Sequence, residues 1–130
     1  MIVIDASALL EALGQTSVAP RVEARVITAG ETLHAPHLID VEVAQVLRRW
    51  VAAGDISQER GREALADLAA FSITRYPHSA LLPRIWELRG KLTVYDAAYV
   101  ALAEALDAPL LTRDRRLAAA PGHTAKIELV

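Results

Sequence analysis

Short apolar segments alternate with helix-forming segments along the whole chain, and this alternation is what most restricts the fold. Strands are expected at residues 2–5, 33–35, 73–76, 109–112 and 126–129. Helices are expected at residues 7–13, 18–29, 36–53, 57–71, 79–89, 93–106 and 115–119. A parallel pair of strands needs a long crossover connection, which is usually a helix. The pattern therefore predicts an α/β sandwich around a mainly parallel sheet of about five short strands.

Length and composition narrow the class of protein. The 130 residues contain no Pro/Gly/Ser-rich linker and no repeat, so one domain spanning residues 1–130 is expected. The absence of cysteine excludes disulfides, thiolate metal sites and a cysteine nucleophile, and a reducing cytoplasmic location is the default. No segment has the roughly 20 apolar residues that span a membrane. The net charge of -2 gives no support to a globally basic nucleic-acid binder.

Four carboxylates stand where an apolar segment ends or a helix begins: Asp5, Glu42, Asp96 and Asp114. Ligand sites in parallel sheets lie beyond the carboxyl ends of the strands, so these acids are expected to meet at one edge. Each also has a local explanation. Asp5 and Asp114 suit helix caps, Asp96 fits a capping box that starts at Thr93, and Glu42 suits a solvated helix face.

A cluster of carboxylates is unfavourable unless a cation lies among them, because like charges raise one another's pKa. Oxygen ligands without cysteine favour Mg²⁺ or Mn²⁺ over zinc. Such ions activate water and neutralise charge on a phosphodiester during in-line displacement. The acids therefore indicate hydrolytic phosphoryl-transfer chemistry.

The residues around these acids resemble the PIN-domain ribonucleases, and among them the VapC-type toxins of bacterial toxin-antitoxin (VapBC) pairs. The matching stretches, in order, are Ile-Val-Ile-Asp5-Ala-Ser7, the run from Pro36 through Glu42 to Arg49, the run from Tyr95-Asp96 to Glu104, and Leu111-Thr112-Arg-Asp114-Arg-Arg-Leu117. No single stretch is specific, but together they span nearly the whole chain.

This resemblance implies a PIN-like three-layer α/β/α sandwich and a Mg²⁺- or Mn²⁺-dependent endoribonuclease. Asp5, Glu42, Asp96 and Asp114 would be its catalytic, metal-binding acids, with Thr112 and Ser7 as supporting polar groups. Asp114 is expected to be the least critical of the four, because a loop position leaves it free to move. The implied partners are an RNA substrate and a VapB-type antitoxin, in a homodimer or in a heterotetramer or hetero-octamer with the antitoxin.

Basic residues near the acids are candidates for contact with RNA phosphates. Arg113, Arg115 and Arg116 are the favoured set. Arg48, Arg49 and Lys91 are equally well explained as cations on solvated helix faces.

Three rival interpretations are weaker. A receiver-like signalling domain needs adjacent acids after the first strand and an acid ending the third, and residues 73–76 carry none. A zinc site at His34 and His37 lacks a third ligand. A PIN-like binding module that has lost catalysis is disfavoured because all four acids are present.

Overall fold

The computed structural model describes residues 1–14, 16–27 and 30–130, and the strands in this part of the chain form one five-stranded parallel sheet. The strand order is β3-β2-β1-β4-β5. The strands are β1 (Ile2–Ile4), β2 (Leu33–Pro36), β3 (Ile73–Tyr76), β4 (Leu110–Thr112) and β5 (Ile127–Leu129). The predicted α/β class and parallel sheet are confirmed.

Helices connect the strands as the pattern predicts. They are α1 (Ala6–Leu13), α2 (Ala19–Ile27), α3 (Leu38–Ala52), α4 (Gln58–Ala70), α5 (Leu82–Glu87), α6 (Val94–Leu106) and α7 (Arg115–Ala119). The predicted end of the second helix at Ala29 lies outside the described residues. The single helix predicted at 79–89 is wrong: a 3₁₀ turn at Ser79–Leu81 precedes α5, whose first turn contains Pro83. Proline lacks the N–H that would continue the earlier turn.

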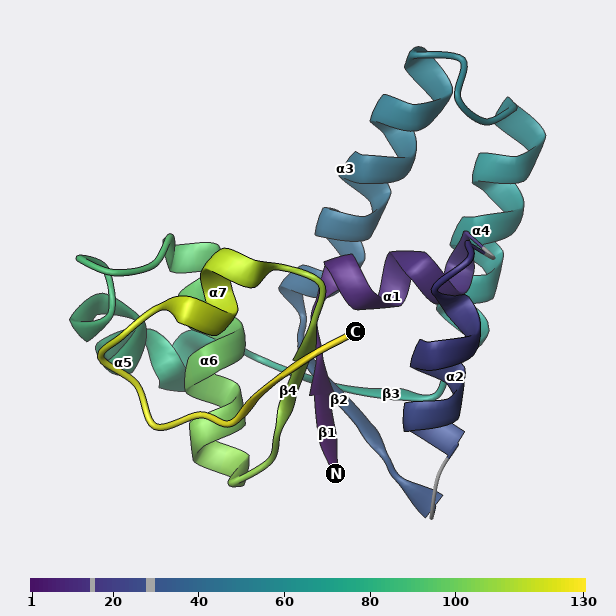
Figure 1. Cartoon of the computed structure of the whole chain (residues 1–130). Helices are drawn as coiled ribbons and strands as arrows, with labels where there is room; N and C mark the ends of the chain where they lie inside the picture. The colour runs from purple at the N-terminus through teal and green to yellow at the C-terminus, as the bar shows by residue number, and fades with distance from the viewer. Residues whose placement is uncertain (15, 28–29) are drawn as a thin grey trace.

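The sheet separates two helical layers (Figure 1). Helices α5 and α6 lie on one side of it, and α1, α2 and α4 lie on the other. Figure 1 also shows α3 and α4 rising beyond the sheet as a hairpin. The three-layer α/β/α arrangement is thus confirmed.

Burial explains why the first strand is central. Ile2, Val3 and Ile4 are all 1% exposed or less, because β1 is paired on both sides and covered on both faces. Continuous apolar residues are typical of such a strand. Parallel pairing places Ile4 beside Leu111, so β1 and β4 end together at one edge. In the described residues, no helix is long and apolar enough to cross a membrane.

Candidate active site

Asp5 leaves β1 at its carboxyl end and enters α1 as the N-cap residue. Its side chain is only 6% exposed. Oδ1 accepts hydrogen bonds from the Ala8 backbone N–H at 2.9 Å and from the Ser7 hydroxyl at 2.6 Å. Oδ2 accepts one from the Thr112 hydroxyl on β4. The helix-cap interpretation of Asp5 is therefore correct, and these bonds fix the orientation of the carboxylate.

Ser7 and Thr112 join the end of β1 to the end of β4. The Ser7 hydroxyl accepts a bond from the Arg113 backbone N–H at 2.9 Å, and the Thr112 hydroxyl accepts one from the Asp114 N–H at 2.9 Å. Both hydroxyls donate a hydrogen bond to Asp5, and their oxygens lie 3.3 Å apart. Thr112, which is fully buried, and Ser7 thus occupy equivalent supporting positions.

Glu42 is held by a residue that sequence reasoning assigned no role. The Tyr99 hydroxyl on α6 donates to Glu42 Oε1 at 2.6 Å. Tyr99 is 1% exposed, and burial, followed by the charge of Glu42, raises the pKa of its phenol, which stays protonated as a donor. A buried tyrosine usually needs a partner for its hydroxyl. Its position one turn after Asp96 was the signal that could have identified it.

Asp96 and Asp114 both lie at helix starts. The Thr93 hydroxyl caps α6 by accepting from the Asp96 backbone N–H at 3.1 Å, as the capping-box pattern predicted. Asp114 caps α7 through Oδ1, which accepts from Arg116 N–H at 2.8 Å and Leu117 N–H at 3.4 Å. This cap orients the Asp114 carboxylate, and the lesser importance expected of Asp114 among the four acids stays a prediction.

The four acids interact electrostatically. Burial raises the pKa of Asp5, against the hydrogen bonds it accepts, and the charge of Asp96 adds to the rise. Burial also raises the pKa of Glu42, with further contributions from Asp96 and Asp5. The pKa of Asp96 is raised by burial and by the charge of Asp114. The structure therefore brings together carboxylates that are costly to ionise side by side.

A hard divalent cation fits these residues by donor type and by charge. All donors are carboxylate oxygens, and a cation offsets the repulsion that raises their pKa values. These residues do not form a preformed metal site with three or more protein ligands. Within residues 1–14, 16–27 and 30–130, no three His, Cys, Asp or Glu side chains lie close enough together to bind one ion. Mg²⁺ commonly binds through one or two carboxylates and keeps several waters.

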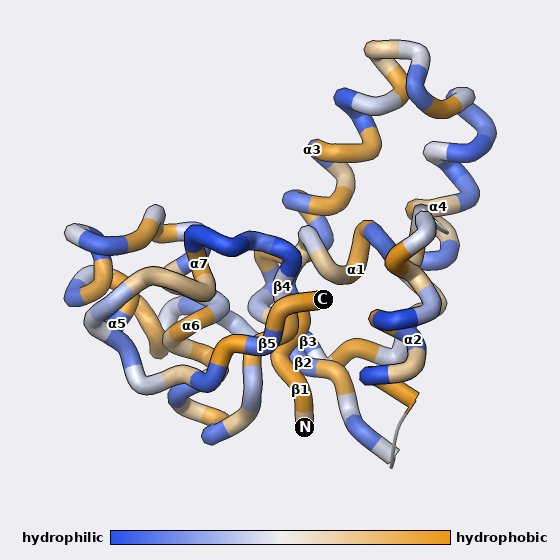
Figure 2. Tube along the Cα trace, in the orientation of Figure 1, coloured by the Kyte–Doolittle hydropathy of each residue, from blue (hydrophilic) through white to orange (hydrophobic). Residues whose placement is uncertain are grey.

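The predicted RNA-contacting arginines differ in their surroundings. Arg113 forms an ion pair with Glu11 of α1, with Nη1 3.3 Å from Oε1. Arg115 and Arg116 are exposed at the start of α7. Figure 2 shows a continuous hydrophilic stretch between β4 and α7, where these residues lie.

His34, which was considered for a zinc site, and the two tryptophans make contacts of their own. His34 Nδ1 lies 2.7 Å from the Tyr76 hydroxyl and Nε2 lies 2.7 Å from the Thr32 hydroxyl, so both ring nitrogens are already engaged. Trp50 packs against the core. Trp86 is 62% exposed, with a guanidinium stacked over its ring at 4.4 Å.

Comparison with known proteins gives a consistent result. The PIN domain family matches residues 2–122. Ribonuclease VapC1 of Mycobacterium tuberculosis H37Rv is 48% identical over 129 residues, covering 98% of this chain and 96% of the relative. Among solved structures, PAE2754 from Pyrobaculum aerophilum is 28% identical and superposes with a TM-score of 0.69, over 97% of this chain and 81% of the other. VapBC2 from Rickettsia felis, bound to a promoter DNA fragment, has a TM-score of 0.72 at 15% identity, over 99% and 98%, which supports the fold.

Proposed function

This chain belongs to the PIN domain family, and within it to the VapC ribonucleases. We propose that it is a toxin endoribonuclease that hydrolyses RNA phosphodiester bonds at its acidic site. The observation that carries the proposal is the position of Asp5 at the adjoining ends of β1 and β4, where Thr112 binds it, with Glu42 and Asp96 near enough for their charges to act on one another. Buried carboxylates that raise one another's pKa values mark functional sites more often than structural ones.

Asp5, Glu42, Asp96 and Asp114 would form the Mg²⁺ or Mn²⁺ site, one or two of them as direct ligands and the others through metal-bound water. When bound, such an ion neutralises charge developing on the phosphate and lowers the pKa of a water molecule. Asp5 is the most firmly positioned, since Ser7, Thr112 and the Ala8 N–H fix both of its oxygens. Glu42 is oriented by Tyr99 from the opposite helix.

Thr112 and Ser7 would act as positioning residues. Both hydroxyls donate hydrogen bonds to Asp5, and their oxygens accept hydrogen bonds from the backbone N–H groups of Asp114 and Arg113. This network ties the loop after β4 to the end of β1. It keeps Asp114 and its neighbouring arginines at the acidic edge, where Arg113, Arg115 and Arg116 would contact RNA phosphates.

An antitoxin partner is proposed from the VapC relationship and from exposed apolar surface. A groove of about 500 Å³ between α3 and α4 is lined largely by apolar side chains, among them Leu47, Val51 and Leu65. Val41, on the same helix as Glu42, is 67% exposed. A VapB-type segment seated on α3 would cover apolar surface and obstruct the acids. We further propose a homodimeric toxin, a heterotetramer or hetero-octamer with antitoxin, and action in the cytoplasm, where its RNA substrate is made.

The decisive experiment is cleavage of RNA by the purified protein with Mn²⁺ or Mg²⁺, with and without EDTA. Asp5→Asn and Asp96→Asn should each abolish cleavage, and EDTA should abolish cleavage by the parent. Asp40→Asn on α3 is a matched control, because its carboxylate pairs with Arg75 instead. Cleavage retained by both site variants would refute the assignment.

The alternative, a PIN-like module without catalysis, predicts a different outcome. Such a module would bind Mn²⁺ poorly in isothermal calorimetry and would not cleave RNA. Mn²⁺ binding that is lost in Asp96→Asn would rule it out.

A further inference from the structure

Outside the acidic site, the most suggestive feature is an open groove of about 540 Å³ lined by three arginines from distant parts of the sequence. Arg21 comes from α2, Arg113 from the loop after β4, and Arg115 from the first position of α7. Val18, Leu129 and Val130 supply apolar lining between them. A groove of this volume is within the range of ligand sites, roughly 300–1,000 Å³.

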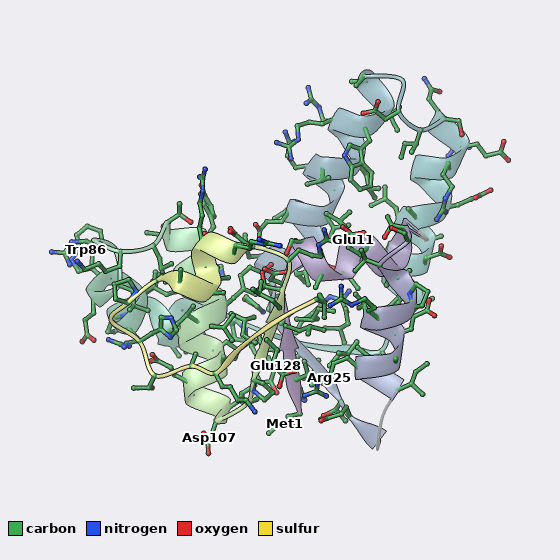
Figure 3. The ribbon with its side chains drawn as sticks, viewed as in Figure 1. Met1, Glu11, Arg25, Trp86, Asp107 and Glu128 are labelled. Carbon is green, nitrogen blue, oxygen red and sulfur yellow. The ribbon has the colours of Figure 1, made fainter. Side chains whose placement is uncertain are left out.

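An ion pair positions α2 along this groove. Arg25, one turn after Arg21 on the same helix face, donates through Nε to Glu128 of β5 at 2.6 Å. Figure 3 shows Arg25 and Glu128 meeting near the sheet. Since Leu129 and Val130 directly follow Glu128, the fixed contact places Arg21 beside the end of β5 and across from α7.

The charges of the groove are incompletely balanced. Arg113 is paired with Glu11, but neither Arg21 nor Arg115 takes part in an ion pair within the described residues. By contrast, Arg25, Arg75 and Arg84 are each paired with a carboxylate. Two unpaired guanidinium groups facing one hollow repel each other and favour an anionic occupant.

The groove adjoins the acids through Arg113. The backbone N–H of Arg113 donates to Ser7, whose hydroxyl donates to Asp5, while the Arg113 side chain lines the groove. Arg115 directly follows Asp114. The groove and the acids therefore lie on the two sides of the segment that contains Arg113.

We propose that this groove binds the RNA backbone on one side of the cleaved phosphate, with Arg21 and Arg115 contacting phosphates. The inference rests on the proposed ribonuclease function and adds Arg21, which lies more than 90 positions from the other arginines. The apolar lining at Val18 and Leu129 packs against sugar and base surfaces. Guanidinium groups over apolar lining suit a single strand, which presents both phosphates and unpaired bases.

The test measures RNA binding without cleavage. In an Asp5→Asn background with EDTA, a labelled single-stranded RNA 12-mer is titrated by fluorescence anisotropy at several salt concentrations. Arg21→Gln and Arg115→Gln should each weaken binding about three- to tenfold and reduce the slope of log K against log salt by about 0.7, the value for one phosphate contact in a single strand. In the double variant Arg21→Gln/Arg115→Gln the slope of log K against log salt should fall by about 1.4.

Arg89→Gln is the matched control, because Arg89 stacks on Trp86, which Figure 3 places at the far edge of the molecule from Arg25 and Glu128. It should change neither affinity nor slope. Unchanged slopes for Arg21→Gln and Arg115→Gln would overturn the groove assignment, and the ribonuclease proposal would stand if the parent still cleaves RNA. An oligo-glutamate peptide that binds more tightly than RNA, and loses affinity in the same variants, would instead assign the groove to an acidic protein segment.

Discussion

Substitution of Asp5 by asparagine or by alanine separates its two roles, as a helix cap and as a charged group. Alanine removes the cap on α1, which costs about 1 kcal/mol. It also leaves the Ser7 and Thr112 hydroxyls without their shared acceptor in a buried setting, at a further cost of about 1–3 kcal/mol. At about 2.1 cal/mol/K per residue, the unfolding entropy of 130 residues converts 1 kcal/mol into roughly 3.7 °C of Tm. Asp5→Ala should therefore melt about 7–15 °C below the parent.

Asparagine keeps the cap. Its amide oxygen can accept from Ala8 N–H and Ser7, while its NH₂ group donates to Thr112, whose hydroxyl can turn toward the Ser7 oxygen 3.3 Å away. It also removes a buried charge whose pKa is raised by desolvation. We expect Asp5→Asn to melt within about 2 °C of the parent, yet to lose RNA cleavage by about 100-fold or more, since catalysis requires the charge.

Thermal unfolding followed by circular dichroism in EDTA, with RNA cleavage by the same samples, checks both expectations. If Asp5→Asn melts as low as Asp5→Ala, the carboxylate charge is structural and the reasoning fails. Full RNA cleavage by Asp5→Asn would show that Asp5 serves only as a helix cap and that catalysis does not need its charge.

Three further predictions follow from individual contacts. Tyr99→Phe removes a hydrogen bond to the Glu42 carboxylate, so it should lower the free energy of unfolding by about 1.5–3 kcal/mol and slow cleavage. Tyr95 is 60% exposed, so the control Tyr95→Phe should change Tm little. Equal Tm values for the two variants would contradict the Glu42 contact. The hydrogen bond with Arg84 lowers the pKa of Glu104 in the folded protein, so Glu104 stabilises the fold above its ordinary pKa of 4.5 and this contribution is lost as the pH falls through the lowered folded value. Glu104→Gln should be about 1–2 kcal/mol less stable than the parent at pH 7. In acid titrations the stability of Glu104→Gln should not show the decrease that Glu104 causes in the parent. Asp107 ends α6 with a left-handed φ of 48°, so Asp107→Gly should raise Tm by about 2–4 °C in calorimetry, and a fall would show that its side chain matters.

Local sequence signals predicted the fold well because they are the signals that form it. The run Ile2-Val3-Ile4 has no polar face, which is typical of a strand buried on both sides, and the structure pairs it with β2 and β4. Thr93 was identified as the start of a capping box from residue type, and its hydroxyl accepts the expected backbone bond. The break before α5 was missed although Pro83 would be the fifth residue of the predicted helix, beyond the first turn that tolerates proline; in the structure α5 begins at Leu82, which places Pro83 in its first turn.

The finer structure of the site could not be predicted, because it depends on pairs that are remote in sequence. Glu42 and Tyr99 are separated by 57 positions, and Ser7 and Thr112 by 105. Periodicity places each of these residues on a helix or strand, but it does not show that a phenol on α6 reaches a carboxylate on α3. Arg21 joins the arginines of α7 for the same reason, through the contact of α2 with β5.

Capping and metal binding were opposed explanations for Asp5 and Asp114 at the level of sequence, and the structure shows why they are compatible. In both residues the cap uses Oδ1. Oδ2 of Asp5 accepts from the Thr112 hydroxyl, and within the described residues Oδ2 of Asp114 accepts no hydrogen bond from the backbone N–H groups of α7. The cap therefore fixes the carboxylate without using both oxygens. A helix start at the carboxyl end of a strand thus orients an acid in advance, so that less side-chain entropy would be lost if a cation or substrate binds there.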